Sequence, residues 1–156
     1  MLYTAEPPLR VVIADDSEVA CSSLRNLLED LPGVVLVGEA RSGPAVVELC
    51  ARVNPAIVLL DIRMPGLNGI QVTTILRREQ PDVRVIILTM FAHHRFLVEA
   101  VRAGAQGYLL KDLDRGELLL ALHTVATGGI YLSPEIAGEA MRHELGCLAG
   151  PALHSS

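Results

Sequence analysis

The sequence contains no tryptophan, and only 3% of its residues are aromatic, so a buried core must be built from aliphatic side chains. Cysteine is also scarce: Cys21, Cys50 and Cys147 are an odd number without CxxC spacing. This pattern favours reduced thiols over a disulfide framework or a zinc site. The apolar runs are strand-sized, and the amino terminus lacks a basic stretch followed by apolar residues. We therefore expect a cytoplasmic protein with no membrane span and no signal peptide.

A surplus of basic residues is lacking too. The formal net charge is −5, whereas a domain that binds nucleic acid by itself normally carries a basic surface. We therefore expect no direct contact between this segment and DNA or RNA. The 156 residues, 51% hydrophobic and 20% charged, fit one globular domain.

Five short runs of β-branched and aliphatic residues recur along the chain and are typical of strands buried on both faces. They are Arg10–Ala14, Val34–Val37, Ala56–Leu60, Arg84–Leu88 and Gly107–Leu110. Segments with apolar residues at helical spacing lie between them. The first is marked by Val19, Leu24, Leu27, Leu28 and Leu31. Strand and helix alternate five times, which predicts a (βα)5 domain of the α/β class with a doubly wound, five-stranded parallel sheet.

Several residues predict where the helices begin and end. Ser42 is a suitable N-cap, and Gly104 stands where a helix would need a left-handed residue at its end. Asp114 and Glu117 form a capping-box pattern before the last helix of the repeat.

Polar residues follow four of the five predicted strands. Asp15 and Asp16 follow the first strand, Asp61 the third, Thr89 the fourth and Lys111 the fifth. Ligands of open parallel sheets bind at the carboxyl ends of the strands, so we expect these side chains at one edge. Three neighbouring carboxylates repel one another and need a cation, and an all-oxygen cluster suits Mg2+.

A carboxylate at such an edge can act as a nucleophile toward phosphorus and form an aspartyl phosphate. Lys111 and Thr89 supply a positive charge and a hydroxyl that could receive the charge of the transferred group. The residues therefore predict a Mg2+-dependent phosphoryl acceptor, with Asp61 as the acceptor.

Four segments in the same order and spacing resemble a response-regulator receiver domain of two-component systems. They are Val11–Asp16, Leu60–Gly69, Ile87–Phe91 and Gly104–Lys111. The resemblance covers residues 9–130 and implies the CheY-like, flavodoxin-like fold. In that fold the strands lie in the order second, first, third, fourth and fifth.

The resemblance also implies a role for each residue of the site. Asp61 would accept a phosphoryl group from a phosphohistidine on a sensor histidine kinase. Mg2+ would be bound by Asp16, Asp61 and the backbone carbonyl of Arg63, with Asp15 acting mainly through water. The phosphoryl oxygens would be held by Lys111, Thr89 and the backbone N–H of Met90. Thr89 and Tyr108 would form the switch pair.

Phe91, Asp112 after Lys111, and the stretch Gly128–Pro134 resemble the NarL/FixJ type. Members of this type usually dimerise and bind DNA through a C-terminal helix-turn-helix domain, and we expect no such domain within these 156 residues. For residues 131–156 we expect a short linker helix to about Leu145, followed by a flexible tail. The chain is then either the receiver part of a transcription factor, which we favour, or a stand-alone receiver acting through protein contacts or a phosphorelay.

Rival functions fit the residues less well. An aspartyl-phosphate phosphatase would usually carry a second aspartate where Arg63 stands, so we expect a signalling phosphoacceptor and not a turnover enzyme. A flavin-binding module would need a phosphate-binding loop where Asp15 and Asp16 lie. A degenerate receiver would lack one of the acidic, threonine or lysine positions. Leu120 falls off the apolar stripe of its helix and could mark a dimer contact, and His93 and His94 are expected on the solvated surface.

Overall fold

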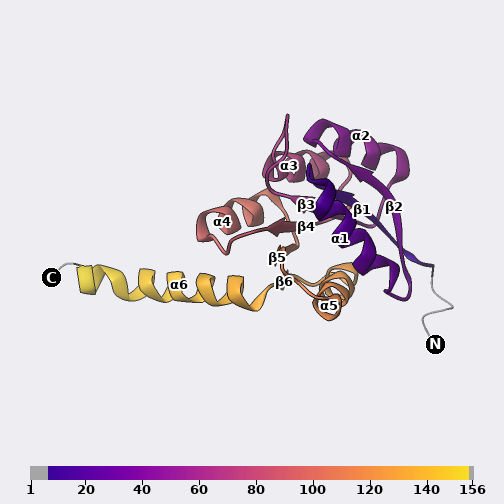
Figure 1. Cartoon of the computed structure of the whole chain (residues 1–156). Helices are drawn as coiled ribbons and strands as arrows, with labels where there is room; N and C mark the ends of the chain where they lie inside the picture. The colour runs from indigo at the N-terminus through magenta and orange to yellow at the C-terminus, as the bar shows by residue number, and fades with distance from the viewer. Residues whose placement is uncertain (1–6, 155–156) are drawn as a thin grey trace.

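A parallel sheet with helices on both faces forms the domain in the computed structural model, which describes the backbone of residues 7–154 and the side chains of residues 7–144 (Figure 1). The strands are β1 (Leu9–Ala14), β2 (Val34–Ala40), β3 (Ile57–Asp61), β4 (Arg84–Thr89), β5 (Gly107–Leu110) and β6 (Tyr131–Leu132). The helices are α1 (Glu18–Glu29), α2 (Gly43–Val53), α3 (Gly69–Glu79), α4 (His94–Ala103), α5 (Arg115–Ala126) and α6 (Pro134–His154).

The sheet order is β2-β1-β3-β4-β5-β6, and every neighbouring pair is parallel. The predicted α/β fold and the order of its first five strands are therefore confirmed. The short strand β6 extends the sheet beyond the five strands expected, because Tyr131 and Leu132 pair with Gly107 and Tyr108.

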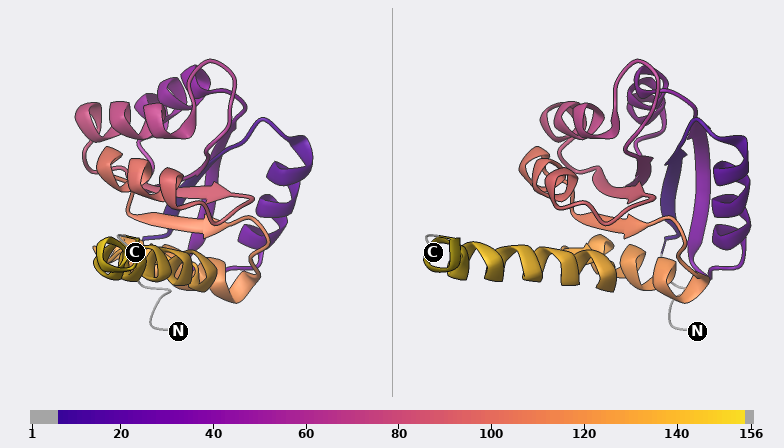
Figure 2. Two further views of the ribbon diagram at one scale, coloured as in Figure 1. Left: turned by 90° about the vertical axis from the view of Figure 1, so that its left-hand side faces the viewer. Right: turned by 60° about the vertical axis from the view of Figure 1, so that its left-hand side comes forward.

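Two apolar cores lie on opposite faces of the sheet. One is formed with α1 and α5, and the other with α2, α3 and α4 (Figures 1 and 2). Alternate residues of β1 serve the two cores: Val11 and Ile13 face the first, whereas Val12 and Ala14 face the second. This alternation buries the strand on both faces and explains its continuous apolar sequence.

The predicted helix signals are found in the structure. The side chain of Ser42 accepts a hydrogen bond from the N–H of Ala45, and Gly104 ends α4 with φ of 105°. Asp114 caps α5 by accepting from the N–H of Glu117. The reciprocal half of the expected capping box is replaced, because the Glu117 carboxylate accepts from the Tyr131 hydroxyl instead.

Two expectations about helices were wrong in detail. Val19 does not belong to the buried stripe of α1, since 76% of it is exposed. Helix α6 continues past Leu145 to His154, because glycines such as Gly146 weaken a helix by only about 1 kcal/mol relative to alanine. The boundary at residue 130 and the flexibility of the tail stay predictions.

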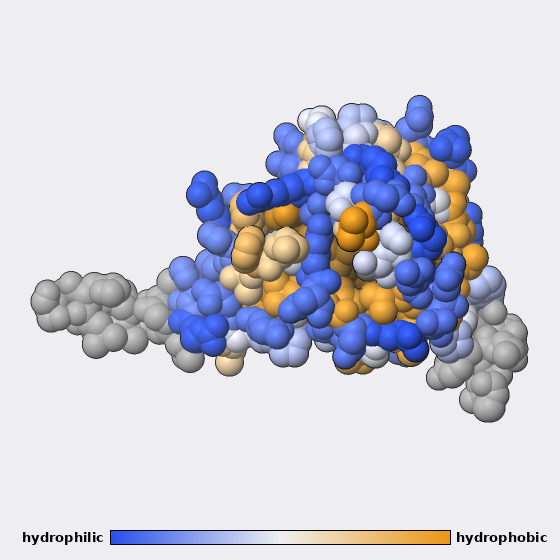
Figure 3. All heavy atoms as spheres, viewed as in Figure 1, coloured by the Kyte–Doolittle hydropathy of each residue, from blue (hydrophilic) through white to orange (hydrophobic). Residues whose placement is uncertain are grey.

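Cys21 and Cys50 are buried free thiols, and the side chain of Cys147 lies outside the described residues. No helix in the described part of the chain combines the length and apolar character needed to cross a membrane. Figure 3 shows apolar patches scattered among mostly hydrophilic residues on one face of the molecule.

Candidate functional site

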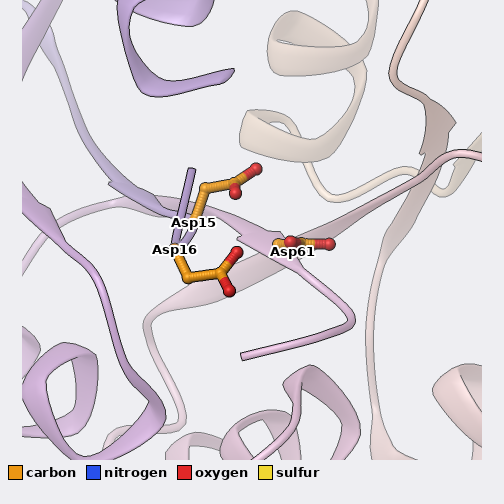
Figure 4. A group of neighbouring side chains, drawn as sticks. All are labelled: Asp15, Asp16 and Asp61. Atoms are coloured by element: carbon orange, nitrogen blue, oxygen red, sulfur yellow. The ribbon is translucent and has the colours of Figure 1, made fainter. Parts of the chain in front are cut away.

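Three carboxylates meet at the carboxyl edge of the sheet (Figure 4). Asp15 and Asp16 follow β1, and Asp61 ends β3. Because β1 and β3 are adjacent and Ala14 pairs with Leu60, the three side chains come together, with one oxygen of each within 4.8 Å of the others. Asp15 is only 1% exposed and Asp61 only 6%, whereas Asp16 is open to solvent.

Lys111 provides the positive charge for the two buried carboxylates. Its Nζ lies 2.8 Å from Oδ2 of Asp15 and 3.2 Å from Oδ2 of Asp61. The resemblance to receiver domains implies that the Lys111 ammonium binds phosphoryl oxygens. In the structure this ammonium contacts both carboxylates. A partly buried ammonium between two carboxylates compensates charge that burial would otherwise penalise strongly.

The titration of the site follows from this arrangement. Burial raises the pKa of Asp61, the negative charge of Asp15 raises it further, and Lys111 offsets only part of the rise. For Lys111, burial lowers the pKa, but its hydrogen bonds to the two carboxylates and their charges outweigh burial, so that its pKa is raised. The lysine is therefore protonated at neutral pH, and Asp61 holds a proton more readily than an ordinary aspartate.

Backbone groups orient the carboxylates. The N–H of Ser17, the N-cap of α1, donates to Oδ1 of Asp15 at 2.9 Å, and the N–H of Arg63 donates to Oδ1 of Asp61 at 3.3 Å. Gly69 begins α3 directly against the acceptor strand. A Cβ on Gly69 would lie 2.5 Å from the carbonyl oxygen of Asp61, so only glycine fits there without movement.

The other predicted residues lie near the edge but are engaged differently. The Thr89 hydroxyl exchanges hydrogen bonds with the backbone of Phe91, donating to its carbonyl at 3.3 Å and accepting from its N–H at 3.4 Å. The Met90 side chain is exposed, and the Tyr108 side chain is buried. The roles of Thr89, Tyr108, the Met90 N–H and the Arg63 carbonyl stay predictions.

The residues present fit Mg2+. Their donor atoms are carboxylate oxygens only, which suits a hard cation, and one of the three carboxylates faces solvent, which leaves room for water ligands. Asp16 and Asp61 would bind the ion, and a bound cation would draw the proton from Asp61.

This competition gives a pH prediction. Because the pKa of Asp61 is raised, Mg2+ affinity should fall as the pH is lowered, beginning above the ordinary aspartate pKa of about 3.9. Isothermal titration calorimetry between about pH 4 and 8 would measure it, with Asp61→Asn as the variant in which the part of this dependence due to Asp61 is lost. An affinity that stays constant down to about pH 4.5 would contradict the prediction.

Sequence reasoning missed two contacts of the site. The thiol of buried Cys21 donates to the carbonyl oxygen of Asp15 at 3.5 Å, and the N–H of Ser17 fixes the Asp15 carboxylate. Ser17 was detectable as a capping residue before an apolar stripe. No local sequence pattern marks Cys21 as a contact of the site.

Comparisons with known proteins agree with this geometry. Residues 11–123 match the profile of the response regulator receiver domain. The chain is 33% identical to the response regulator GacA of Pseudomonas aeruginosa over 129 residues, which are 83% of this chain and 60% of GacA. It is 34% identical to the nitrate/nitrite response regulator NarL of Escherichia coli K12 over 128 residues, 82% of this chain and 59% of NarL.

Solved structures show the same likeness. A two-component response regulator of the LuxR family from Aurantimonas superposes with a TM-score of 0.84 at 32% identity, covering 88% of this chain and 99% of that structure. The signal receiver domain of the NarL regulator from Mycobacterium tuberculosis gives 0.75 at 35% identity, covering 78% and 98%. This chain spans about three fifths of the curated relatives it matches. It belongs to the response regulator receiver domain family, with NarL-type and LuxR-type regulators among its relatives.

Proposed function

We propose that Asp61 accepts a phosphoryl group from a phosphohistidine of a sensor histidine kinase. The observation that carries the proposal is a buried Asp61 flanked by Asp15, Asp16 and the Lys111 ammonium at one strand edge. An Asp61 carboxylate oxygen forms the new bond to phosphorus, the phosphorus–nitrogen bond breaks, and the imidazole leaves with its electron pair. Asp61 must be ionised to attack, so the groups that lower its pKa also prepare it for reaction.

The surrounding residues would stabilise the charge of the transferred group. Mg2+, when bound, neutralises negative charge on the phosphoryl oxygens. Lys111 can turn from Asp61 toward a phosphoryl oxygen while keeping its contact with Asp15. Thr89 could reach the same group if it gave up its hydrogen bonds to Phe91. Arg63 stands where a phosphatase would place its acid, which favours a signalling acceptor over a turnover enzyme.

A groove beside the site supports a protein phosphodonor. It has a volume of about 760 Å³, and polar site residues and apolar side chains line it together. Asp15 and Lys111 form one part, and the exposed side chains of Val19 and Met90 form another. Exposed apolar residues beside a reactive group favour docking of another protein.

The output we propose is control of transcription. Phosphorylation would change the surface of the receiver and promote homodimerisation, and DNA would be bound only through a separate domain. The curated relatives support this output because several are named as transcriptional or response regulators, and each extends well beyond the region aligned with this chain.

The central test is phosphorylation by a small donor. Incubation with Mg2+ and acetyl phosphate should add the mass of one phosphoryl group, roughly 80 Da, to the intact protein by the reaction class proposed. Asp61→Asn should show no gain, and omission of Mg2+ should remove most of it. An unchanged wild-type mass, or an equal gain in Asp61→Asn, would overturn the proposal.

The proposed phosphorylation-induced dimerisation leads to a separate prediction. Leu120 on α5 is 55% exposed, and neighbouring Leu119 is also exposed. We expect Leu120→Asp to abolish phosphorylation-induced dimerisation in size-exclusion chromatography with light scattering, with less than about 0.5 kcal/mol change in stability because the side chain is exposed. Val101→Asp on α4 is the matched control, since Val101 is an exposed apolar residue on another helix. A Leu120→Asp protein that dimerises like wild type would exclude this surface.

A further inference from the structure

Strand β6 and the part of α6 up to residue 144 form a cover over β5 and α4, defined here as residues 131–144 (Figure 2). Ile136 is almost completely buried in the same core as Tyr108 and Leu97. Ser133 joins the cover to β5 twice: its N–H donates to the Tyr108 carbonyl at 3.0 Å, and its hydroxyl accepts from the N–H of Leu110 at 3.0 Å. These residues follow the region matched by the family profile, which ends at residue 123.

The interface between the cover and the rest of the domain contains polar atoms whose burial is not compensated by hydrogen bonds. Among the described residues, two buried side-chain polar atoms lack a hydrogen-bond partner, the Tyr108 hydroxyl and Nδ1 of His94. Tyr108 packs in the core that includes Ile136, and the ring of His94 stacks on His143 of α6 with centroids 3.5 Å apart. His94 is thus half-buried, whereas the sequence predicted a solvated side chain. Buried polar groups without partners destabilise the closed arrangement, and exposure to water would relieve them.

The segment between α5 and β6 has the properties of a hinge. Gly128 has φ of 96°, and Gly129 separates it from the exposed Ile130 and β6. Both glycine N–H groups donate back to the end of α5, so the hinge stays attached to that helix. Besides its pairing with β5, β6 is joined to α5 by a partly exposed hydrogen bond, which the Tyr131 hydroxyl donates to the Glu117 carboxylate.

We propose that residues 131–144 open from β5 and α4 as one unit about Gly128–Gly129, while the rest of the domain stays folded. Opening would hydrate the Tyr108 hydroxyl and the ring of His94. The closed state is held by Ile136 and the Ser133 hydrogen bonds, and it is weakened by the two unpartnered atoms.

Amide hydrogen exchange of the intact 156-residue chain, followed by NMR at neutral pH, tests the proposal. The N–H groups of Leu110 and Ser133 report opening, and those of Ile13 and Val58 in the central strands report global unfolding. Leu110 and Ser133 should exchange faster than the central strands by at least about tenfold, as expected for sub-global opening.

The decisive variant is Tyr108→Phe, which removes the unpartnered hydroxyl and keeps the ring. It should slow exchange at Leu110 and Ser133 roughly 5- to 100-fold relative to the wild-type protein. His94→Phe, which keeps an aromatic ring against His143, should act in the same direction. Tyr131→Phe is the matched control: its hydroxyl has a partner, so the same chemical change should not slow exchange. Exchange at Leu110 and Ser133 that equals the central strands, or that Tyr108→Phe leaves unchanged or accelerates, would overturn the proposal.

Discussion

Replacing Lys111 with methionine is expected to lower the free energy of unfolding of the metal-free protein by about 3 to 5 kcal/mol at neutral pH. The variant leaves Asp15 and Asp61 buried next to each other without the ammonium that now contacts both. Urea denaturation in the presence of a chelator would measure the change. Because protonation removes the repulsion, the loss should shrink as the pH falls toward the raised pKa of Asp61. Added Mg2+ should restore part of the stability.

The matched control is Arg115→Met. Arg115 forms an ion pair with Asp30 at 3.1 Å, but both side chains are more than half exposed. Its removal should cost less than about 1 kcal/mol and should depend little on Mg2+. Equal losses for the two variants would show that burial of the Lys111 cluster adds nothing to its contribution.

Replacing Gly69 with alanine should damage both stability and phosphorylation. The added Cβ would lie 2.5 Å from the carbonyl oxygen of Asp61 and 2.9 Å from Cα of Ile62, so the β3–α3 connection has to move. We expect a loss of about 1 to 3 kcal/mol in denaturation experiments. Because displacement of a reacting group by about 1 Å can cost about 100-fold in rate, phosphorylation by acetyl phosphate should also slow by at least about tenfold.

Gly116→Ala provides the comparison. Gly116 lies in the first turn of α5, where a Cβ would meet only the Asp114 carboxylate, at 3.5 Å. Alanine there should be neutral or stabilising by up to about 1 kcal/mol, with phosphorylation unchanged. A Gly69→Ala protein that is phosphorylated at the wild-type rate would show that the backbone at Asp61 tolerates the displacement.

The parts of the fold predicted from the sequence were those encoded locally. The five main strands are continuous apolar runs, and residues such as Ser42 and Gly104 mark helix ends without help from distant residues. The carboxylate cluster was predictable because parallel strands bring their carboxyl ends to one edge. Asp15 and Asp61 therefore needed only the sheet order to be placed together.

The missed features depend on distance in the chain or on short segments. Strand β6 has two residues, too few for a periodic pattern. Val19 precedes Leu24 by five residues, which turns it about 140° away from the buried stripe at about 100° per residue. The stacking of His94 on His143 joins residues from different helices, and no local pattern marks it.

The ion pair of Lys111 also has a consequence for how the protein matures. Lys111 and Asp15 are separated by 96 positions in the sequence, and strands β3 and β4 lie between their strands in the sheet. Contacts of this separation form only once the intervening chain has closed. A chain interrupted before β5, or still being synthesised, contains all three aspartates but not their ammonium. Therefore, only molecules whose sheet has been assembled through β5 contain the complete site of three aspartates and one lysine.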